Sequence, residues 1–341
     1  MLVPHLPALI LAPMQGLTDA PMRAYQRESG AFTFAVSEFL RVSGDVPPAK
    51  MFFRHVPELH DAGRTPSGLP VQVQLLGGDP GRMAESAVVA AQAGAAAIDI
   101  NFGCPAPTVN RHDGGAALLK SPARIEAIVA AVRAALPPSV PVSAKLRLGW
   151  DSADAIFENA DRAAAGGAAW VTIHGRTKMQ GYAPPADWER IGQVRERLPI
   201  PVVANSDLWT LEDFKRCRDQ TGCSHFMLGR GALANPHLPQ QIACEMGIAT
   251  KPCPADATQP IDWRPHLTRL IALTAQIEGK ALTDKRSDHF IVCRLKQWLN
   301  LAAKQGNFAE FEAVKRLETV TELFAFLERM EEPALEVPVY S

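Results

Sequence analysis

Residues 97–105 read AIDINFGCP, and this stretch shows the pattern that decides the fold. An apolar run is followed at once by small and polar residues. Seven other runs of the chain have a similar length and character: Ala8–Met14, Phe34–Phe39, Val71–Gly77, Val142–Gly149, Trp170–Arg176, Pro201–Asp207 and His225–Gly231. Near-continuous apolar runs are typical of parallel strands that are buried on both faces. Together with Ala97–Gly103, they predict eight parallel strands.

Alanine-rich segments with helical spacing lie between these runs. They are Gly81–Ala93, Pro122–Leu136, Ala153–Ala165, Asp187–Leu198 and Thr210–Gln220. Asp79 and Ser121 each precede a proline, as N-cap residues do, while Gly94 and Gly166 stand where C-caps are expected. Eight such units predict an α/β fold, a (β/α)8 TIM barrel over residues 1–248, close to the typical length of about 250 residues. An open doubly wound sheet is disfavoured because no GxGxxG turn follows an early strand.

The pattern changes after the eighth unit. Residues 251–265 contain four prolines, which predicts a linker over 249–265. Beyond it, apolar residues recur at helical spacing over 288–304 and over 308–330. These segments predict a small C-terminal helical bundle over 266–341.

The composition excludes several classes of protein. The chain has 341 residues, a formal net charge of −1, 47% hydrophobic and 21% charged residues, which excludes a disordered or fibrous chain. No apolar run approaches the roughly 18 residues of a membrane span, and no basic segment of a signal peptide precedes the first apolar run. Six cysteines without a CxxC pair favour a reducing compartment over a disulfide framework. We therefore expect a cytoplasmic protein.

The carboxyl ends of the strands, where a barrel carries its active site, are rich in polar residues. Asp99, Lys145, Arg147 and His174 belong to the fourth, fifth and sixth runs. Buried polar groups must pair with one another or bind a ligand. Mutual pairing of Lys145, Asp99 and Glu38 is one explanation. A ring of polar groups drawn from seven or eight strand ends favours a ligand site.

The loops after the seventh and eighth strands suggest which ligand is bound, because these loops form the usual phosphate site of the fold. Residues 205–207 (Asn-Ser-Asp) and 229–231 (Gly-Arg-Gly) offer small side chains, backbone N–H groups and one guanidinium. This set fits a phosphate monoester such as the tail of FMN. Lys145 within a strand needs an anion, and reduced flavin carries negative charge near N1 and the C2 carbonyl. Gln74 is expected to bond the isoalloxazine edge, with the backbone of 13–14 against the ring.

Cys104 is the candidate acid of this site. A thiol with an ordinary pKa of about 8.5 is protonated at pH 7 and can donate a proton in a transition state. A nucleophilic thiol would need a His–carboxylate partner, of which His174 supplies only half.

The other five cysteines have no expected chemistry. Four of them are interpreted as small buried hydrophobes, namely Cys217, Cys223, Cys244 and Cys293, and Cys253 is a linker residue without an evident role. Only His225 lies near Cys217 and Cys223 in the sequence, so no metal site is expected.

Five blocks together resemble the flavin-dependent tRNA-dihydrouridine synthases, in order and in spacing, over essentially the whole chain. The blocks are Ala12–Asp19, Asp99–Pro105, Lys145–Gly149, His174–Thr177 and Gly229–Ala232. Four stretches resemble the bacterial C subclass, which acts on uridine 16 of the D-loop: Glu38–Val42, Arg64–Gly68, Leu148–Ser152 and Arg294–Leu299.

The resemblance implies reduction of uridine to dihydrouridine, with FMN as cofactor, NADPH as reductant and Cys104 as the proton donor to C5. It implies that Asn101 orients the uracil and that His174 lies over the flavin. The implied isoalloxazine contacts are Pro13, Met14, Gln15, Gln74 and Lys145. The implied phosphate contacts are Asn205, Ser206, Asp207, Gly229 and Arg230. Ser206 departs from the family, which usually has glycine there. If this position needs a positive φ, serine is costly.

The resemblance also implies a tRNA partner. Residues 285–304 carry five basic residues and one acidic residue, a local charge of +4. A solvated helix face is the usual explanation of such a run, and the resemblance favours RNA binding instead. The residues expected to bind the RNA substrate are Arg41, Arg147, Arg294, Lys296 and Lys315. We expect a monomer without metal or membrane attachment. A barrel dehydrogenase for a free pyrimidine and a non-catalytic RNA-binding barrel are the alternatives.

Overall fold

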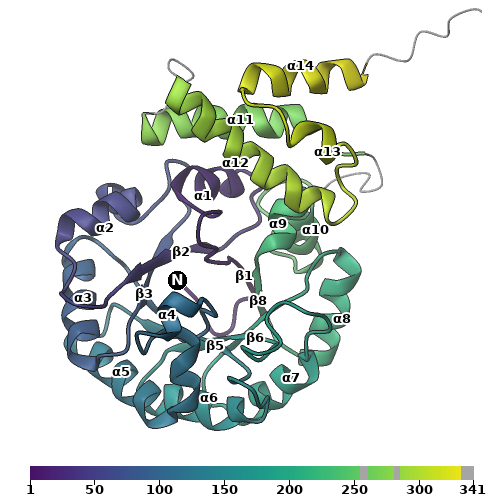
Figure 1. Ribbon diagram of the computed structural model, residues 1–341. Coiled ribbons are helices and arrows are strands. Elements are labelled where there is room, and N and C mark those ends of the chain that lie inside the picture. Colours follow the sequence, from purple (N-terminus) through teal and green to yellow (C-terminus); the bar gives the residue numbers. More distant parts are fainter. Residues whose placement is uncertain (254–259, 280–284, 332–341) are drawn as a thin grey trace, which may run out of the picture. The chain divides into compact units, whose positions relative to one another are not determined.

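The computed structural model describes residues 1–253, 260–279 and 285–331. Eight parallel strands form a closed barrel in the order β1 to β8, ringed by helices (Figure 1). The strands are β1 (Ala8–Leu11), β2 (Phe34–Arg41), β3 (Val71–Leu76), β4 (Ile98–Asn101), β5 (Val142–Arg147), β6 (Trp170–His174), β7 (Val202–Asn205) and β8 (His225–Leu228). Each predicted run overlaps one strand, with β2 continuing two residues beyond its run, so the predicted (β/α)8 barrel is confirmed.

The five predicted barrel helices are confirmed to within two residues at each end. They are α3 (Pro80–Gln92), α5 (Pro122–Ala135), α6 (Ala155–Ala165), α7 (Trp188–Arg197) and α8 (Leu211–Thr221). The sequence reasoning did not name α1 (Ala20–Arg27), α2 (Ala49–His55), α4 (Pro107–Asn110), α9 (Arg230–Ala234), α10 (Leu238–Glu245) and the short 3-10 turns η1 (Pro57–Asp61) and η2 (Gly115–Lys120).

The predicted helix caps are confirmed only in part. The Asp79 carboxylate accepts a 2.8 Å hydrogen bond from the Arg82 N–H, as an N-cap does. Ser121 is the N-cap residue of α5, as expected, but its side chain makes no capping hydrogen bond. Gly166 is the C-cap residue of α6, as expected, and Gly94 follows Ala93, the C-cap residue of α3, with a φ of +106°.

The two sides of the barrel interior differ in polarity. Apolar side chains from β1, β2, β6, β7 and β8 form one core cluster, which includes Ile10, Phe34, Val203 and Met227. On β3, β4 and β5 the parallel register instead pairs Gln74 with Asp99 and Asn101 with Lys145. A polar layer is therefore built into one side of the barrel, below the carboxyl ends of its strands.

The expectations for Cys244, Cys253 and Cys293 are wrong. Cys244, at the end of α10, forms a disulfide with Cys253. The sequence separation of 9 falls outside the CxxC spacing, and the chain turns back after α10 to bring the two sulfurs together. Cys217 and Cys223 are free and buried as expected, whereas Cys293 is exposed.

The chain divides into two compact units. The first comprises Met1–Ala232 with His237–Ala255, and the second comprises Leu233–Pro236 with Asp256–Ser341. Parts of the predicted linker (254–259) and of the predicted helical bundle (280–284 and 332–341) lie outside the described residues. Among the described helices, none is both long and apolar enough to cross a membrane.

The second unit contains α11 (Trp263–Glu278), α12 (Lys285–Ala303), α13 (Phe311–Val314) and α14 (Val320–Glu331). The segment 308–330, where apolar residues recur at helical spacing, contains two helices, because a new helix begins within it. The Thr319 hydroxyl accepts from the Glu322 N–H, and the Glu322 carboxylate accepts from the Thr319 N–H, which is a capping box. On α12, Phe290 is 38% exposed and lies off the apolar face that was expected to include it.

Candidate active site

A cavity of about 300 Å³ opens at the carboxyl ends of the barrel strands. Thirteen of the predicted site residues line it: Pro13, Met14, Gln15, Asn101, Cys104, Lys145, Arg147, His174, Asn205, Ser206, Asp207, Gly229 and Arg230. Gln74 and Arg41 are absent from the lining, and Arg294, Lys296 and Lys315 belong to the second unit.

Gln74 lies beneath the cavity, in a chain of buried hydrogen bonds. Its Nε2 donates to Asp99 Oδ2 at 2.7 Å, and its Oε1 accepts from Asn101 Nδ2 at 2.9 Å. Ser143 Oγ donates to the second oxygen of Asp99 at 2.5 Å. An ionised carboxylate only accepts hydrogen bonds, so Asp99 orients the Gln74 amide, which in turn orients Asn101.

Asn101 shapes the loop that carries the cysteine. Its Oδ1 accepts from the backbone N–H groups of Gly103 at 2.9 Å and Cys104 at 2.8 Å. Both ends of the Asn101 amide are therefore engaged within the protein. Gly115, with a φ of +58°, lies so close that an added Cβ would be 2.9 Å from the Cys104 carbonyl oxygen. These contacts fix the turn that presents the thiol to the cavity.

Cys104 is a free, half-buried thiol. Burial raises the pKa of this thiol, and it outweighs the opposing influences of a backbone hydrogen bond and of Arg147 and Arg41. At neutral pH the sulfur is therefore protonated, which suits a general acid and does not suit a nucleophile.

Lys145 is the buried cation of the cavity. Its Nζ donates a 3.0 Å hydrogen bond to Asn205 Oδ1. Burial lowers the pKa of Lys145 to about 8, with repulsion from Arg147 adding to the effect and attraction to Asp99 opposing it. Burial likewise raises the pKa of Asp99 to about 6, against its hydrogen bonds to Ser143 and Gln74 and its attraction to Lys145. At pH 7 both groups are mainly charged.

His174 faces the cavity as a neutral ring. Burial and the surrounding cations, Arg147 first among them, hold the pKa of His174 well below its usual value. Its Nδ1 is buried and has no hydrogen-bond partner among the described residues. A buried polar atom without a partner costs free energy, so this atom points to a ligand.

Arg147 fastens two loops at the rim of the cavity. Its Nε donates to the Gly103 carbonyl at 2.8 Å, and its Nη1 donates to the carbonyls of Thr177 at 3.2 Å and Gly181 at 2.8 Å. The guanidinium also lies 5.2 Å from the ring centroid of Tyr182. Arg147 thus joins the loop of Cys104 to the loop after β6.

Two aromatic residues in lining loops, Tyr182 and Trp209, were missed by the sequence reasoning, as was Phe39 of β2. The guanidinium of Arg230 lies 4.6 Å from the Tyr182 ring centroid and 4.9 Å from that of Trp209. Tyr182 is 54% exposed and lies in an irregular loop. Neither Tyr182 nor Trp209 belongs to a periodic pattern. The only signal was an aromatic residue in a loop at the carboxyl end of a strand.

Ser206 has a φ of +142° and Asp207 a φ of +50°, so the conformational cost anticipated for a serine at this position is present. Ser206 compensates through its hydroxyl, which accepts from the Gly175 N–H at 2.8 Å. The Asp207 carboxylate pairs with the buried guanidinium of Arg176 and accepts from the Ala186 N–H at 3.1 Å. Only the backbone of Asp207 remains for an anion.

The basic residues expected to bind RNA make contacts of their own. Arg41 Nη2 donates to the Thr108 carbonyl at 3.4 Å in the first unit. In the second unit, Lys296 Nζ donates to the carbonyls of Lys315 at 3.2 Å and Leu317 at 2.8 Å. Lys315 pairs with Glu312, and burial lowers the pKa of Arg294 to about 10. Arg41, Lys296 and Lys315 are thereby held in place by these contacts, and Arg294 is partly buried.

Within the described residues, no group of three or more His, Cys, Asp or Glu side chains is placed to hold a metal ion.

Comparison with known proteins gives consistent results. The sequence model of the dihydrouridine synthase (Dus) family matches residues 10–326. The chain is 42% identical over 296 residues to a tRNA-dihydrouridine(16) synthase of Pseudomonas putida, covering 87% of this chain and 88% of that protein. It is 41% identical over 323 residues to a tRNA-dihydrouridine(16) synthase of Shewanella oneidensis, covering 94% of this chain and 97% of that protein.

Among solved structures, the fold resembles histamine dehydrogenase from Rhizobium sp. 4-9. The TM-score is 0.56 at 15% sequence identity, and the match covers 79% of this chain and 50% of that chain. At this identity the likeness concerns the barrel fold alone.

Proposed function

The chain belongs to the dihydrouridine synthase family, and from this membership we propose that it reduces uridine 16 of tRNA to 5,6-dihydrouridine, with FMN as cofactor and NADPH as reductant. The reaction adds a hydride to C6 and a proton to C5 of the uracil ring. The observation that carries the proposal is that a protonated thiol, Cys104, and a buried ammonium, Lys145, line one cavity at the carboxyl ends of a closed barrel.

The residues that line the cavity fit a flavin. The unpartnered His174 Nδ1 offers a hydrogen bond, and the buried Lys145 ammonium favours an anionic neighbour such as the N1–C2 region of a reduced flavin. Bound there, the flavin supplies the hydride for C6 of the substrate. We assign the isoalloxazine side of the cavity to Pro13, Met14, Gln15, Lys145 and His174. Gln74, which the sequence placed here too, does not line the cavity and acts through its hydrogen bond to Asn101.

We assign the phosphate to the loops after β7 and β8. This end of the cavity is lined by Asn205, Ser206, Asp207, Gly229 and Arg230. The Asp207 carboxylate is already paired with Arg176, so Asp207 acts through its backbone N–H. Backbone N–H groups and one guanidinium suit a phosphate monoester.

Cys104 donates the proton to C5. Its raised pKa keeps the thiol protonated at neutral pH, and Asn101 holds the loop that presents it. The substrate uracil lies between this thiol and the flavin, with Asn101 beside it. A base in folded RNA reaches such a site only after leaving its stack.

We propose that the tRNA is oriented by Arg41 and Arg147 of the first unit and by Arg294, Lys296 and Lys315 of the second. Salt bridges and carbonyl contacts hold the side chains of Arg41, Arg147, Lys296 and Lys315 in defined positions. Contacts from such basic side chains to phosphates position an RNA without reading its sequence. Since the substrate is tRNA, we place the reaction in the cytoplasm.

The competing function is the reduction of a free pyrimidine by the same site. Two measurements separate the possibilities. The purified protein should show FMN absorbance that NADPH bleaches, and the reduced flavin should be reoxidised by tRNA lacking dihydrouridine but not by uracil or uridine. Position-by-position mapping of dihydrouridine in tRNA from cells that lack the protein should show loss at position 16. Reoxidation by free uracil would support the small-molecule enzyme instead.

A further inference from the structure

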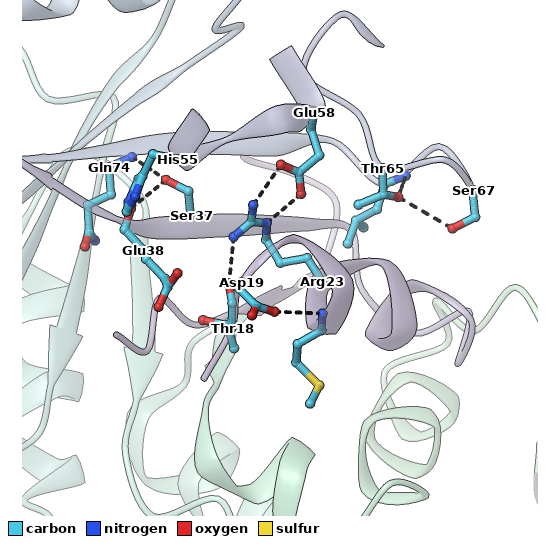
Figure 2. Close-up of polar contacts among 12 residues, drawn as sticks. Thr18, Asp19, Arg23, Ser37, Glu38, His55, Glu58, Thr65, Ser67 and Gln74 are labelled. Atoms are coloured by element: carbon cyan, nitrogen blue, oxygen red, sulfur yellow. Dashed lines mark hydrogen bonds and ion pairs between the residues drawn. The ribbon is translucent and has the colours of Figure 1, made fainter. Parts of the chain in front are cut away.

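A buried ion pair lies behind one wall of the cavity. Arg23 on α1 is 0% exposed and Glu58 in η1 is 4% exposed. Arg23 Nε and Nη2 donate two parallel hydrogen bonds of 2.7 Å to the Glu58 carboxylate. The third guanidinium nitrogen, Nη1, donates at 2.7 Å to the Thr18 carbonyl (Figure 2).

Stability alone explains this pair poorly. Moving both charges out of water is costly, and well-packed apolar residues of similar volume are often as stable or more stable. The third hydrogen bond, to Thr18, distinguishes the pair from a simple cross-link between α1 and η1. Thr18 precedes α1, so no helical N–H group is available for its carbonyl.

Thr18 in turn holds the wall of the cavity. Its hydroxyl accepts from the Met14 N–H at 2.8 Å and donates to the Ala12 carbonyl at 3.2 Å. Its own N–H donates to the Met14 carbonyl at 3.0 Å. Ala12, Met14 and Leu17 all line the cavity. Thr18 therefore holds the loop over residues 12–18 through its hydrogen bonds, and Arg23 holds Thr18.

A second anchor acts on the same loop from β2. The Glu38 carboxylate accepts a hydrogen bond from the N–H of Gly16, which has a φ of +75°. The loop over 12–18 is thus held by Glu38 at its tip and by Arg23 at its base. The Glu58 carboxylate fixes the guanidinium plane through two bonds, so Nη1 can point only toward the Thr18 carbonyl.

We propose that Arg23 and Glu58 are a positioning pair, which sets the 12–18 wall of the cavity and thereby the affinity for the flavin. This inference rests on the proposed function in one respect, namely that the cavity binds FMN. It assigns neither residue a contact with substrate or cofactor.

The central experiment replaces both charges at once. The double variant Arg23→Met with Glu58→Leu leaves no buried charge unpaired, so its urea midpoint should equal or exceed that of the wild type. Its FMN dissociation constant should rise by about tenfold, because the wall is no longer anchored. Amide hydrogen exchange over residues 14–18 of the flavin-free protein should become faster. The matched control is Arg162→Met with Glu126→Leu, an ion pair of 2.8 Å on the outer helices, which should leave all three measurements unchanged.

A second variant tests the route through Thr18 and remains informative if the double variant does not fold. Thr18→Val removes the hydroxyl at nearly constant volume and leaves the ion pair intact. It should also weaken FMN binding, and the effects of the two changes should not add in a double-mutant cycle.

Wild-type FMN affinity in a folded double variant, wild-type FMN affinity in Thr18→Val, or additive effects in the cycle would overturn the positioning role. Failure of the proposed function would be seen differently: the wild-type protein would bind FMN but form no dihydrouridine in tRNA.

Discussion

Asn101 holds Cys104 through a 2.8 Å hydrogen bond from the cysteine N–H to the asparagine side-chain oxygen. The same oxygen binds the Gly103 N–H, and the Asn101 amide nitrogen donates to Gln74. The position of the thiol is therefore set inside the barrel, by a chain of hydrogen bonds that ends at Asp99.

Replacing the thiol separates the two halves of the reaction. Cys104→Ala should keep FMN and its reduction by NADPH, because no other function of the cavity uses the sulfur. Dihydrouridine formation in tRNA should fall by about 10²-fold or more, the range for loss of a general acid. Stopped-flow reoxidation of the flavin by tRNA measures this step. Full turnover by the variant would remove Cys104 from the role of proton donor.

The buried Asp99 predicts a particular dependence of stability on pH. Its pKa is raised from 3.8 to about 6 in the folded protein, so folding favours the neutral acid. That contribution is fully present below about pH 4 and is lost as the pH rises through 6, a change on the order of 3 kcal/mol. Asp99→Asn does not titrate. The free energy of unfolding of the wild type, minus that of the variant, should therefore fall between pH 4 and pH 7.

Urea unfolding of both proteins across this range gives the difference directly. The exposed Asp45→Asn is a control for the loss of one negative charge. A difference that stays constant from pH 4 to pH 7 would contradict the raised pKa of Asp99.

Two substitutions at Ser206 separate backbone strain from the hydroxyl contact. Ser206→Ala keeps the φ of +142° and loses the bond from the Gly175 N–H, so it should destabilise the fold. Ser206→Gly loses the same bond but relieves the strain. The glycine variant should be more stable than the alanine variant by about 1 kcal/mol. Thermal unfolding measures the order, and equal stability of the two variants would show that the backbone there is unstrained.

The second unit should contribute to RNA affinity and not to flavin chemistry. Arg294→Ala combined with Lys296→Ala should weaken tRNA binding and lower the slope of log K against log salt by about one to two. Reduction of the flavin by NADPH should be unchanged. Lys215→Ala on α8 is a suitable control, since Lys215 lies next to Glu245 at 3.9 Å. Unchanged tRNA affinity at physiological salt would exclude both residues from the interface.

Local sequence was sufficient for the barrel, because a strand buried on both faces leaves a run of apolar residues that needs no partner to be recognised. It was not sufficient where the structure depends on register. Gln74 and Asp99 become neighbours only when β3 and β4 pair. Arg23 and Glu58 meet across 35 residues of sequence, and neither stands in a motif.

In the second unit, local sequence alone contained the signal for the break between α13 and α14. Thr319 and Glu322 have the spacing of a capping box, which marks a helix start. This signal was overlooked because apolar residues keep a helical spacing on both sides of it. Tyr182 had no local signal beyond its place in a loop after β6.

The closure of the barrel has a consequence for the newborn chain. β1 pairs with β8, with Leu11 opposite Leu228. One edge of the first strand therefore stays unpaired until the last strand has been made. The cavity has walls from both ends, with Pro13 and Met14 on one side and Gly229 and Arg230 on the other. During synthesis on the ribosome, the cofactor therefore has no complete site until the eighth strand has emerged. With the proposed flavin site, we expect cofactor binding to be a late event that reports closure of the barrel.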